Sequence, residues 1–154
     1  MNVKKTNITL ILSFVFAFLA LGIVVAAAFL LPSTFDSYVG IMQKSALFTD
    51  AKRTEALVIL YAILVPALAA DVSLIAVLRL VAKGEIFSKQ AVRLLTVIPV
   101  CCFAETVLFG LLGMYFLISF AITFAALFLG FVLLVVRNVI AEAAAIKAEN
   151  DFTV

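Results

Sequence analysis

Residues 94–136, LLTVIPVCCFAETVLFGLLGMYFLISFAITFAALFLGFVLLVV, decide the fold of this chain. Glu105 is the only charged residue among these 43. One membrane-spanning helix needs about 20 predominantly apolar residues, so the stretch is about twice as long as a single crossing. It therefore predicts two membrane helices that fold back on each other. We expect the turn near residues 113–120, where Gly113 and Tyr115 interrupt the apolar run.

The composition of the whole chain agrees with a membrane protein. Hydrophobic residues make up 67% of the 154 residues and charged residues 13%, whereas soluble domains are about half apolar and about a quarter charged. The formal net charge of +2 does not favour nucleic-acid binding. The chain has no histidine, which excludes Ser-His or Cys-His catalysis and most zinc sites. We therefore expect a protein that is not an enzyme, holds no metal or cofactor and does not bind nucleic acid directly.

Two further apolar stretches precede this one, which predicts a single all-α membrane domain, a four-transmembrane-helix bundle. The apolar run from Ile8 to Leu31 is longer than the core of a signal peptide, so we expect a retained transmembrane helix. Pro32 is expected to end it, and a polar loop is expected to continue to Ala56. The predicted helices cover residues 6–31, 51–83, 89–114 and 120–149, and the fourth extends into the cytoplasm.

The segment AKGEIFSKQ, residues 82–90, predicts a tight turn between the second and third helices. Gly84 suits the left-handed conformation that often follows a helix, because it lacks a Cβ. Ser88 is expected to cap the start of the next helix, with Phe87 and Val92 packed across the cap. The two helices joined by this turn should be antiparallel neighbours.

Lysine and arginine residues predict the direction of the chain in the membrane. Eight of them lie on the side of the two termini and the 84–88 turn, and three lie on the side of the 32–56 segment. Because cytoplasmic segments carry the excess of positive residues, both termini should face the cytoplasm. The eight are Lys4, Lys5, Arg79, Lys83, Lys89, Arg93, Arg137 and Lys147, and the three are Lys44, Lys52 and Arg53.

Two carboxylates, Asp71 and Glu105, are each the only charge in an apolar stretch. Placing such a charge at membrane depth costs about 2.5–3.5 kcal/mol on insertion scales, so an intramembrane acid is a candidate functional residue. The two acids lie on adjacent antiparallel helices, about 15 and 21 Å from the predicted cytoplasmic ends. Two interpretations remain open. The acids are protonated groups that hydrogen bond between helices, to partners such as Ser73, Thr96 or Thr106, or they form a site for a proton, a cation or a cationic ligand.

Small residues recur at four-residue spacing, which lets helix backbones approach closely in lipid. This spacing favours packing within one chain, and a homo-oligomer face is the alternative. The pairs are Ser13/Ala17, Gly22/Ala26, Ala69/Ser73 and Ala126/Gly130.

Two segments resemble a known family. They are GEIFSKQAVRLL at residues 84–95 and VRNVIAEAAAIKAENDFTV at residues 136–154. The closing E-N-D-hydrophobic-T-hydrophobic pattern after an alanine-rich helix is similar to that of the bacterial membrane family called domain of unknown function 2975. Phe152 stands where the family more often has leucine. The resemblance implies four crossings in the bacterial cytoplasmic (inner) membrane.

Members of that family are often encoded beside a small helix-turn-helix transcription regulator, which implies a sensory or regulatory membrane partner for such a protein. Under this interpretation the cytoplasmic partner face consists of Gly84, Phe87, Ser88, Glu149, Asn150, Asp151, Phe152 and Thr153. A different class of function, a small proton- or cation-coupled transporter or a resistance or immunity protein, would use Asp71 and Glu105. A structural membrane subunit is a third alternative. A gene for a toxin or an efflux protein beside this one would favour the second class.

Overall fold

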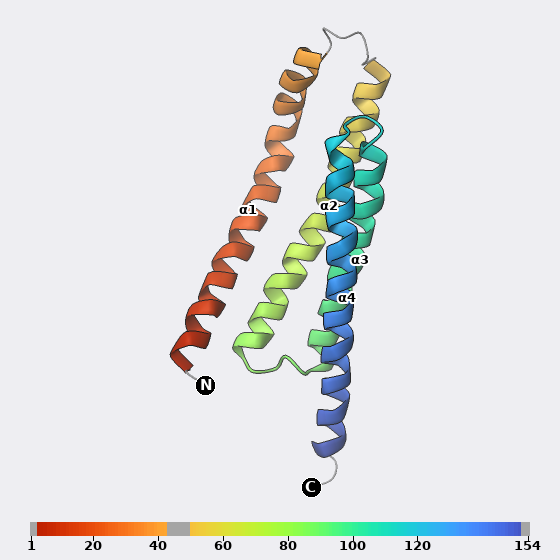
Figure 1. The fold of residues 1–154 in the computed structure, drawn as a ribbon. Coiled ribbons are helices and arrows are strands. Elements are labelled where there is room, and N and C mark those ends of the chain that lie inside the picture. The colour runs from red at the N-terminus through yellow and green to blue at the C-terminus, as the bar shows by residue number, and fades with distance from the viewer. Residues whose placement is uncertain (1–2, 43–49, 152–154) are drawn as a thin grey trace.

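The computed structural model describes residues 3–42 and 50–151, with side chains described over 8–37 and 52–150. This part of the chain is all helical. It contains α1 (Val3–Met42), α2 (Asp50–Ala82), α3 (Lys89–Leu112) and α4 (Ile118–Asp151). The helices run up and down, so that α1 begins, α4 ends and the 84–88 turn lies at one end, here named the terminal end (Figure 1). The predicted all-α fold with four helices is confirmed.

Each helix contains a stretch that is long and apolar enough to cross a membrane. The outward side chains on these stretches include many large hydrophobic ones, such as Phe29, which is 81% exposed. Lipid is the solvent that suits such a surface, and helices suit lipid because they satisfy their own backbone hydrogen bonds. The chain is a multi-pass membrane protein. Its candidate spans are Ile8–Ser37, Lys52–Ala82, Lys89–Leu112 and Ile118–Asn150.

The helices pack in chain order, α1 on α2, α2 on α3 and α3 on α4. Over the described residues α1 does not pack along α3 or α4, so the bundle is open and α1 lies along one side of α2 (Figure 1). One cluster of buried residues lies toward the end opposite the terminal end and takes members from α1, α2 and α3. Its members are Phe35, Ala56, Ile63 and Leu112.

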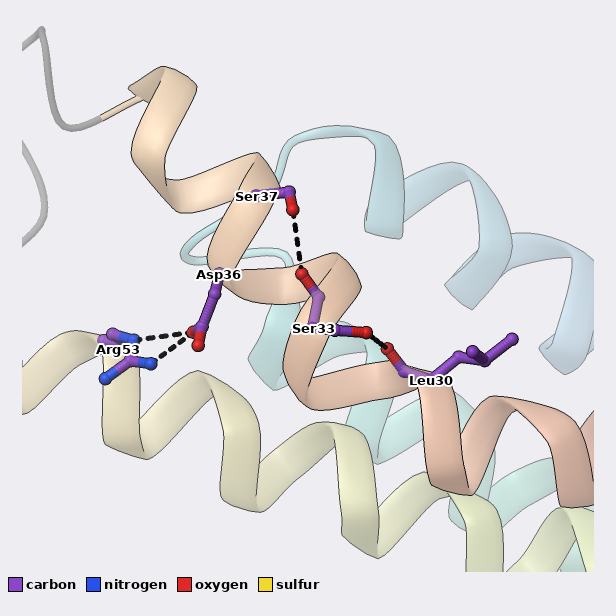
Figure 2. A network of polar contacts seen from close by, with 5 residues as sticks. All are labelled: Leu30, Ser33, Asp36, Ser37 and Arg53. Carbon is purple, nitrogen blue, oxygen red and sulfur yellow. Dashed lines mark hydrogen bonds and ion pairs between the residues drawn. The ribbon is translucent and has the colours of Figure 1, made fainter.

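The first helix differs from the prediction. Pro32 does not end it, because α1 continues to Met42, so the first part of the predicted loop is helical. The second helix begins at Asp50, one residue before its predicted start, and residues 43–49 lie outside the described residues. Polar side chains support the helix around the proline. The hydroxyls of Ser33 and Thr34 donate to the Leu30 carbonyl at 3.0 and 2.8 Å. Ser37 donates in the same way to the Ser33 carbonyl at 2.9 Å (Figure 2).

Tertiary contacts hold the continued part of α1 against the rest of the molecule. Phe35 is buried, and its ring meets the ring of Phe116 edge-on, with centroids 6.2 Å apart. Asp36 forms an ion pair with Arg53 of α2 (Figure 2). These partners lie far along the chain from Pro32, so local sequence signals did not reveal them. The start of α1 lies three residues before the predicted one, and both ends of α2, α3 and α4 lie within two residues of the prediction.

The turn at residues 83–88 confirms the predicted capping. Gly84 has a φ of +76°. The Gly84 N–H donates to the Val81 carbonyl at 3.0 Å and the Glu85 N–H donates to the Leu80 carbonyl at 2.9 Å, which is the Schellman pattern at a helix end. The Ser88 hydroxyl accepts a hydrogen bond from the Ala91 N–H at 3.2 Å, as an N-cap does.

The small-residue pairs have different surroundings. Ala126 is buried, and a Cβ added at Gly130 would lie 3.1 Å from the ring of Phe103. This pair therefore brings α4 close to α3 within the chain, as predicted. In α1, by contrast, Gly22 and Ala26 are exposed.

Candidate functional site

A groove of about 220 Å³ lies at the terminal end, between the 84–88 turn and the last turns of α4. It brings together the two segments on which the family resemblance rests, although they are far apart in sequence. Its lining residues are Gly84, Glu85, Phe87 and Ser88 from the turn, and Ala144, Lys147 and Ala148 from α4.

The groove follows from the unequal lengths of two antiparallel helices. α3 has 24 residues and α4 has 34, so α4 continues beyond the start of α3 and past the turn (Figure 1). Ala144 and Ala148 are four residues apart and share one face of α4. Their small side chains leave space beside the turn, which larger residues would fill.

The groove offers mixed chemistry. Glu85 and Lys147 supply one charge of each sign, and both are exposed. Phe87 is apolar and 43% exposed. The Ser88 hydroxyl caps α3, so its role in the groove is partly structural. Such a combination suits recognition of a protein surface with an apolar centre and a polar rim.

The predicted partner face is only partly gathered here. Gly84, Phe87 and Ser88 line the groove. Glu149 and Asn150 are exposed in the last described turn of α4 but do not line it. The side chains of Asp151, Phe152 and Thr153 lie outside the described residues. Sequence reasoning missed four lining residues, and the four-residue spacing of the two alanines was the available signal. The four are Glu85, Ala144, Lys147 and Ala148.

The α4 segment beside the groove is amphipathic. Val139 and Ile146 are seven residues apart and therefore share a face. They are 60% and 55% exposed. A neighbouring polar face is also exposed and consists of Asn138, Glu142 and Glu149. An exposed apolar stripe next to the groove enlarges the surface available to a partner.

The two membrane acids lie on neighbouring helices that pack on each other. Asp71 in α2 and Glu105 in α3 are both half-buried. Glu105 lies on the face of α3 that packs on α2, because Leu108 and Leu112, three and seven residues later, pack with the core that contains Ile63 of α2.

Asp71 lies on a different face. Asp71 lies eleven residues after Leu60, a separation of about three helical turns, and seven residues before Leu78, a separation of about two turns. The three side chains therefore share one face of α2. Leu60 and Leu78 both line grooves against α1. Asp71 is therefore turned toward the α1 side of α2, while Glu105 approaches α2 from the α3 side.

The remaining polar candidates are not gathered around the acids. Ser73 is buried and lies about 200° around α2 from Asp71, two residues away. The Thr106 hydroxyl donates to the Cys102 carbonyl at 2.8 Å within α3. Among the described residues, neither carboxyl takes part in a hydrogen bond or an ion pair. Ser73 and Thr106, the predicted polar partners, therefore make no hydrogen bond to the two carboxyls among the described residues.

Arg137 and Thr96 make a separate polar contact between α3 and α4. The Arg137 Nε donates to the Thr96 hydroxyl at 3.0 Å, and that hydroxyl donates to the Val92 carbonyl at 2.8 Å. The arginine also donates to the Asn138 side chain. Within residues 8–37 and 52–150 no group of three Cys, Asp or Glu side chains is arranged to hold a metal ion.

Comparison with known proteins gives one match. The family model described as "Protein of unknown function (DUF2975)" matches residues 34–154, well over half of the chain, and confirms the resemblance. The match includes the 84–88 turn and the end of α4. Neither a curated protein nor a solved structure matches the chain.

Proposed function

The chain belongs to the DUF2975 family, and we propose that it is a membrane partner of a small helix-turn-helix transcription regulator, which docks at the groove beside the 84–88 turn. The observation that carries the proposal is that this groove joins the turn segment to the end of α4. Those are the two segments with the most distinctive sequence in the chain. In this proposal the terminal end faces the bacterial cytoplasm, as the count of lysine and arginine supports.

The groove has the chemistry that a docked helix or loop requires. An amphipathic helix typically lays its apolar face into such a groove and uses charges at the rim for orientation. Phe87 supplies an exposed aromatic anchor, and aromatic residues are frequent hot spots of interfaces. Glu85 and Lys147 stand at the rim, where opposite charges on the partner select the docking direction.

The same elements that form the groove also cross the membrane. α4 is one continuous helix from Ile118 to Asp151, and the turn joins α2 directly to α3. A shift in the packing of α3 against α4 would therefore change the width of the groove. This continuity supports a sensory role, in which an event in the membrane holds or releases the regulator.

The docking proposal is tested with the full-length protein in nanodiscs and the helix-turn-helix regulator encoded beside its gene. Ala148→Arg places a long side chain in the groove, and we expect it to abolish binding in biolayer interferometry. Ala145→Arg is the matched control, because Ala145 is exposed on the same helix but does not line the groove. Removal of residues 147–154 is also expected to abolish binding. Wild-type affinity for both Ala148→Arg and the truncated protein would overturn the proposal.

A second candidate is proton- or cation-coupled transport, or a related resistance or immunity function. It is supported by two half-buried acids on neighbouring membrane helices, Asp71 in α2 and Glu105 in α3. Uptake into proteoliposomes driven by a proton gradient is the test, with Asp71→Asn and Glu105→Gln as variants. Unchanged uptake in both variants, or loss only together with folding, would remove this candidate.

A further inference from the structure

The interface between α1 and α2 contains a groove of about 400 Å³ that the docking proposal does not use. Four of its lining residues come from α1 and two from α2. They are Ser13, Phe16, Ala17, Ala20, Leu74 and Leu78. The volume falls in the range of about 300–1,000 Å³ that is typical of sites for small organic molecules. Alanines on the α1 side keep the groove open, and leucines on the α2 side make it apolar.

Asp71 does not line this groove, but it lies on the same face of α2 as the two leucines that do. It is three residues before Leu74 and seven before Leu78, so the three side chains share one face of α2. Asp71 is therefore about one helical turn from the nearest lining residue. Among the described residues no lysine or arginine pairs with it. None of the residues that line the groove is charged, and the spacing along α2 puts the Asp71 carboxyl about one turn beyond the lining.

The remaining chemistry of the groove favours an organic cation over a metal ion. Phe16 is 67% exposed and lines the groove, so its ring face is available to a cation. A metal ion would need several oxygen ligands. The one hydroxyl in the lining, that of Ser13, already donates to the Thr9 carbonyl at 2.9 Å. A lipophilic cation needs no such ligands, because its own surface is apolar.

We propose that the α1–α2 groove binds a compact lipophilic cation, with Asp71 as its counter-charge and Phe16 against its apolar surface. The ligand enters from the lipid, because α1 packs along α2 alone over the described residues. The groove is separate from the regulator-docking groove at the terminal end. The proposal deepens the second candidate function, because it names a class of ligand and places its binding site on the α1 side of α2. Binding of the cation does not require the protein to be a transporter. Only transport of the cation rests on that candidate function.

The test measures binding of tetraphenylphosphonium to the full-length protein in nanodiscs by equilibrium dialysis. We expect saturable binding of one equivalent, and an affinity at least about tenfold lower for Asp71→Asn because the counter-charge is lost. Glu105→Gln should retain the affinity, because Glu105 approaches α2 from the α3 side. The neutral triphenylphosphine oxide should bind more weakly than the cation and lose nothing on Asp71→Asn.

A steric pair of variants tests the location independently of the charge. Ala20→Phe fills the groove, and we expect it to remove binding. Ala26→Phe is the matched control, because Ala26 is exposed on α1 and does not line the groove. Circular dichroism and size-exclusion profiles check that each variant folds. If Asp71→Asn fails to fold, Asp71→Glu retains the charge and should bind, and the steric pair still decides.

Three results would overturn the proposal. They are wild-type binding by folded Asp71→Asn, wild-type binding by Ala20→Phe, and loss of binding in Glu105→Gln alone. Tetraphenylphosphonium uptake into proteoliposomes separates binding from transport. Asp71-dependent binding without uptake would support the groove and remove the transporter candidate.

Discussion

Tyr61 of α2 donates a hydrogen bond to the carbonyl oxygen of Ala28 in α1, across 3.4 Å. Pro32 has no N–H, so it leaves the Ala28 carbonyl without its usual donor four residues ahead. A neighbouring helix supplies the missing donor, which is one way in which membrane helices tolerate proline. This contact explains why α1 continues where the local sequence predicts a stop.

Tyr61→Phe should therefore destabilise the protein, and the cost should depend on Pro32. We expect a loss of about 0.6 kcal/mol in the free energy of unfolding, the average for interhelical hydrogen bonds in a membrane protein. In the Pro32→Ala background the cost should nearly vanish, because residue 32 then supplies the donor. A double-mutant cycle from unfolding in mixed micelles measures this coupling. An equal cost in both backgrounds would contradict this role for Tyr61.

Tyr115, in the turn between α3 and α4, should titrate at unusually high pH. Its hydroxyl donates to the Glu55 carboxylate at 2.5 Å, and this hydrogen bond raises the pKa of Tyr115 above 10.0. Glu55→Gln should bring that pKa back toward 10.0. The chain has no tryptophan, so tyrosinate absorbance near 295 nm follows the titration directly. The difference between the titration curves of the wild type and Tyr115→Phe identifies the transition of Tyr115. An unchanged midpoint of this transition in Glu55→Gln would refute the role of Glu55 in raising the pKa of Tyr115.

The sign of the linked stability follows from the raised pKa. The folded state favours neutral Tyr115, so the contribution of this contact is fully present below the unfolded pKa near 10.0. It is lost as the pH rises through the folded-state pKa. Wild type should therefore lose more stability than Tyr115→Phe when the pH is raised from 9 to about 11.

Gly84→Ala should destabilise the turn by about 1–2 kcal/mol, because a left-handed conformation brings Cβ near the following carbonyl. No atom beyond Gly84 and its two chain neighbours lies within 4 Å of the added Cβ, so the cost comes from the local backbone conformation and not from a tertiary clash. Gly22→Ala is the control, since Gly22 is helical and also has open space around it. That variant should be neutral or slightly stabilising. Thermal unfolding followed by circular dichroism compares the two, and equal effects would argue against the conformational cost.

Gly130→Ala should weaken the packing of α4 on α3 by about 1–3 kcal/mol. Its Cβ would lie 3.1 Å from the Phe103 ring and 3.3 Å from the Cys102 Cβ. Gly110→Ala provides the comparison in the same interface, because its Cβ would lie 3.8 Å from the Thr123 methyl group. We expect that variant to retain wild-type stability in the same unfolding assay. The reverse order of stabilities would mean that Gly130 does not limit the approach of the helices.

Much of the fold was accessible from local signals. The apolar run over 94–136 predicted two crossings, and the structure has α3 and α4 there. The Gly84 and Ser88 caps were also predicted, because each acts on a backbone group within five residues. The same local reasoning failed at Pro32. The partners of that region, Tyr61, Arg53 and Phe116, lie in other parts of the chain.

The candidate sites show the same division. The sequence identified Asp71 and Glu105 as acids in apolar helices, since charge and hydropathy are properties of the residues alone. It did not show that Asp71 lies toward α1 and Glu105 approaches from the α3 side. Rotation of a helix about its axis is set by the packing of its neighbours.

The sequence by itself determined that this is a four-helix membrane protein with a capped turn at residues 84–88. Hydropathy, helix length and capping act over one helix or one turn, so residues that are close in the sequence determine them. Only the tertiary structure decided that the turn and the end of α4 share a groove, and that α1 continues beyond Pro32. Those features depend on which helices are neighbours and how far each extends, and packing between distant segments sets both.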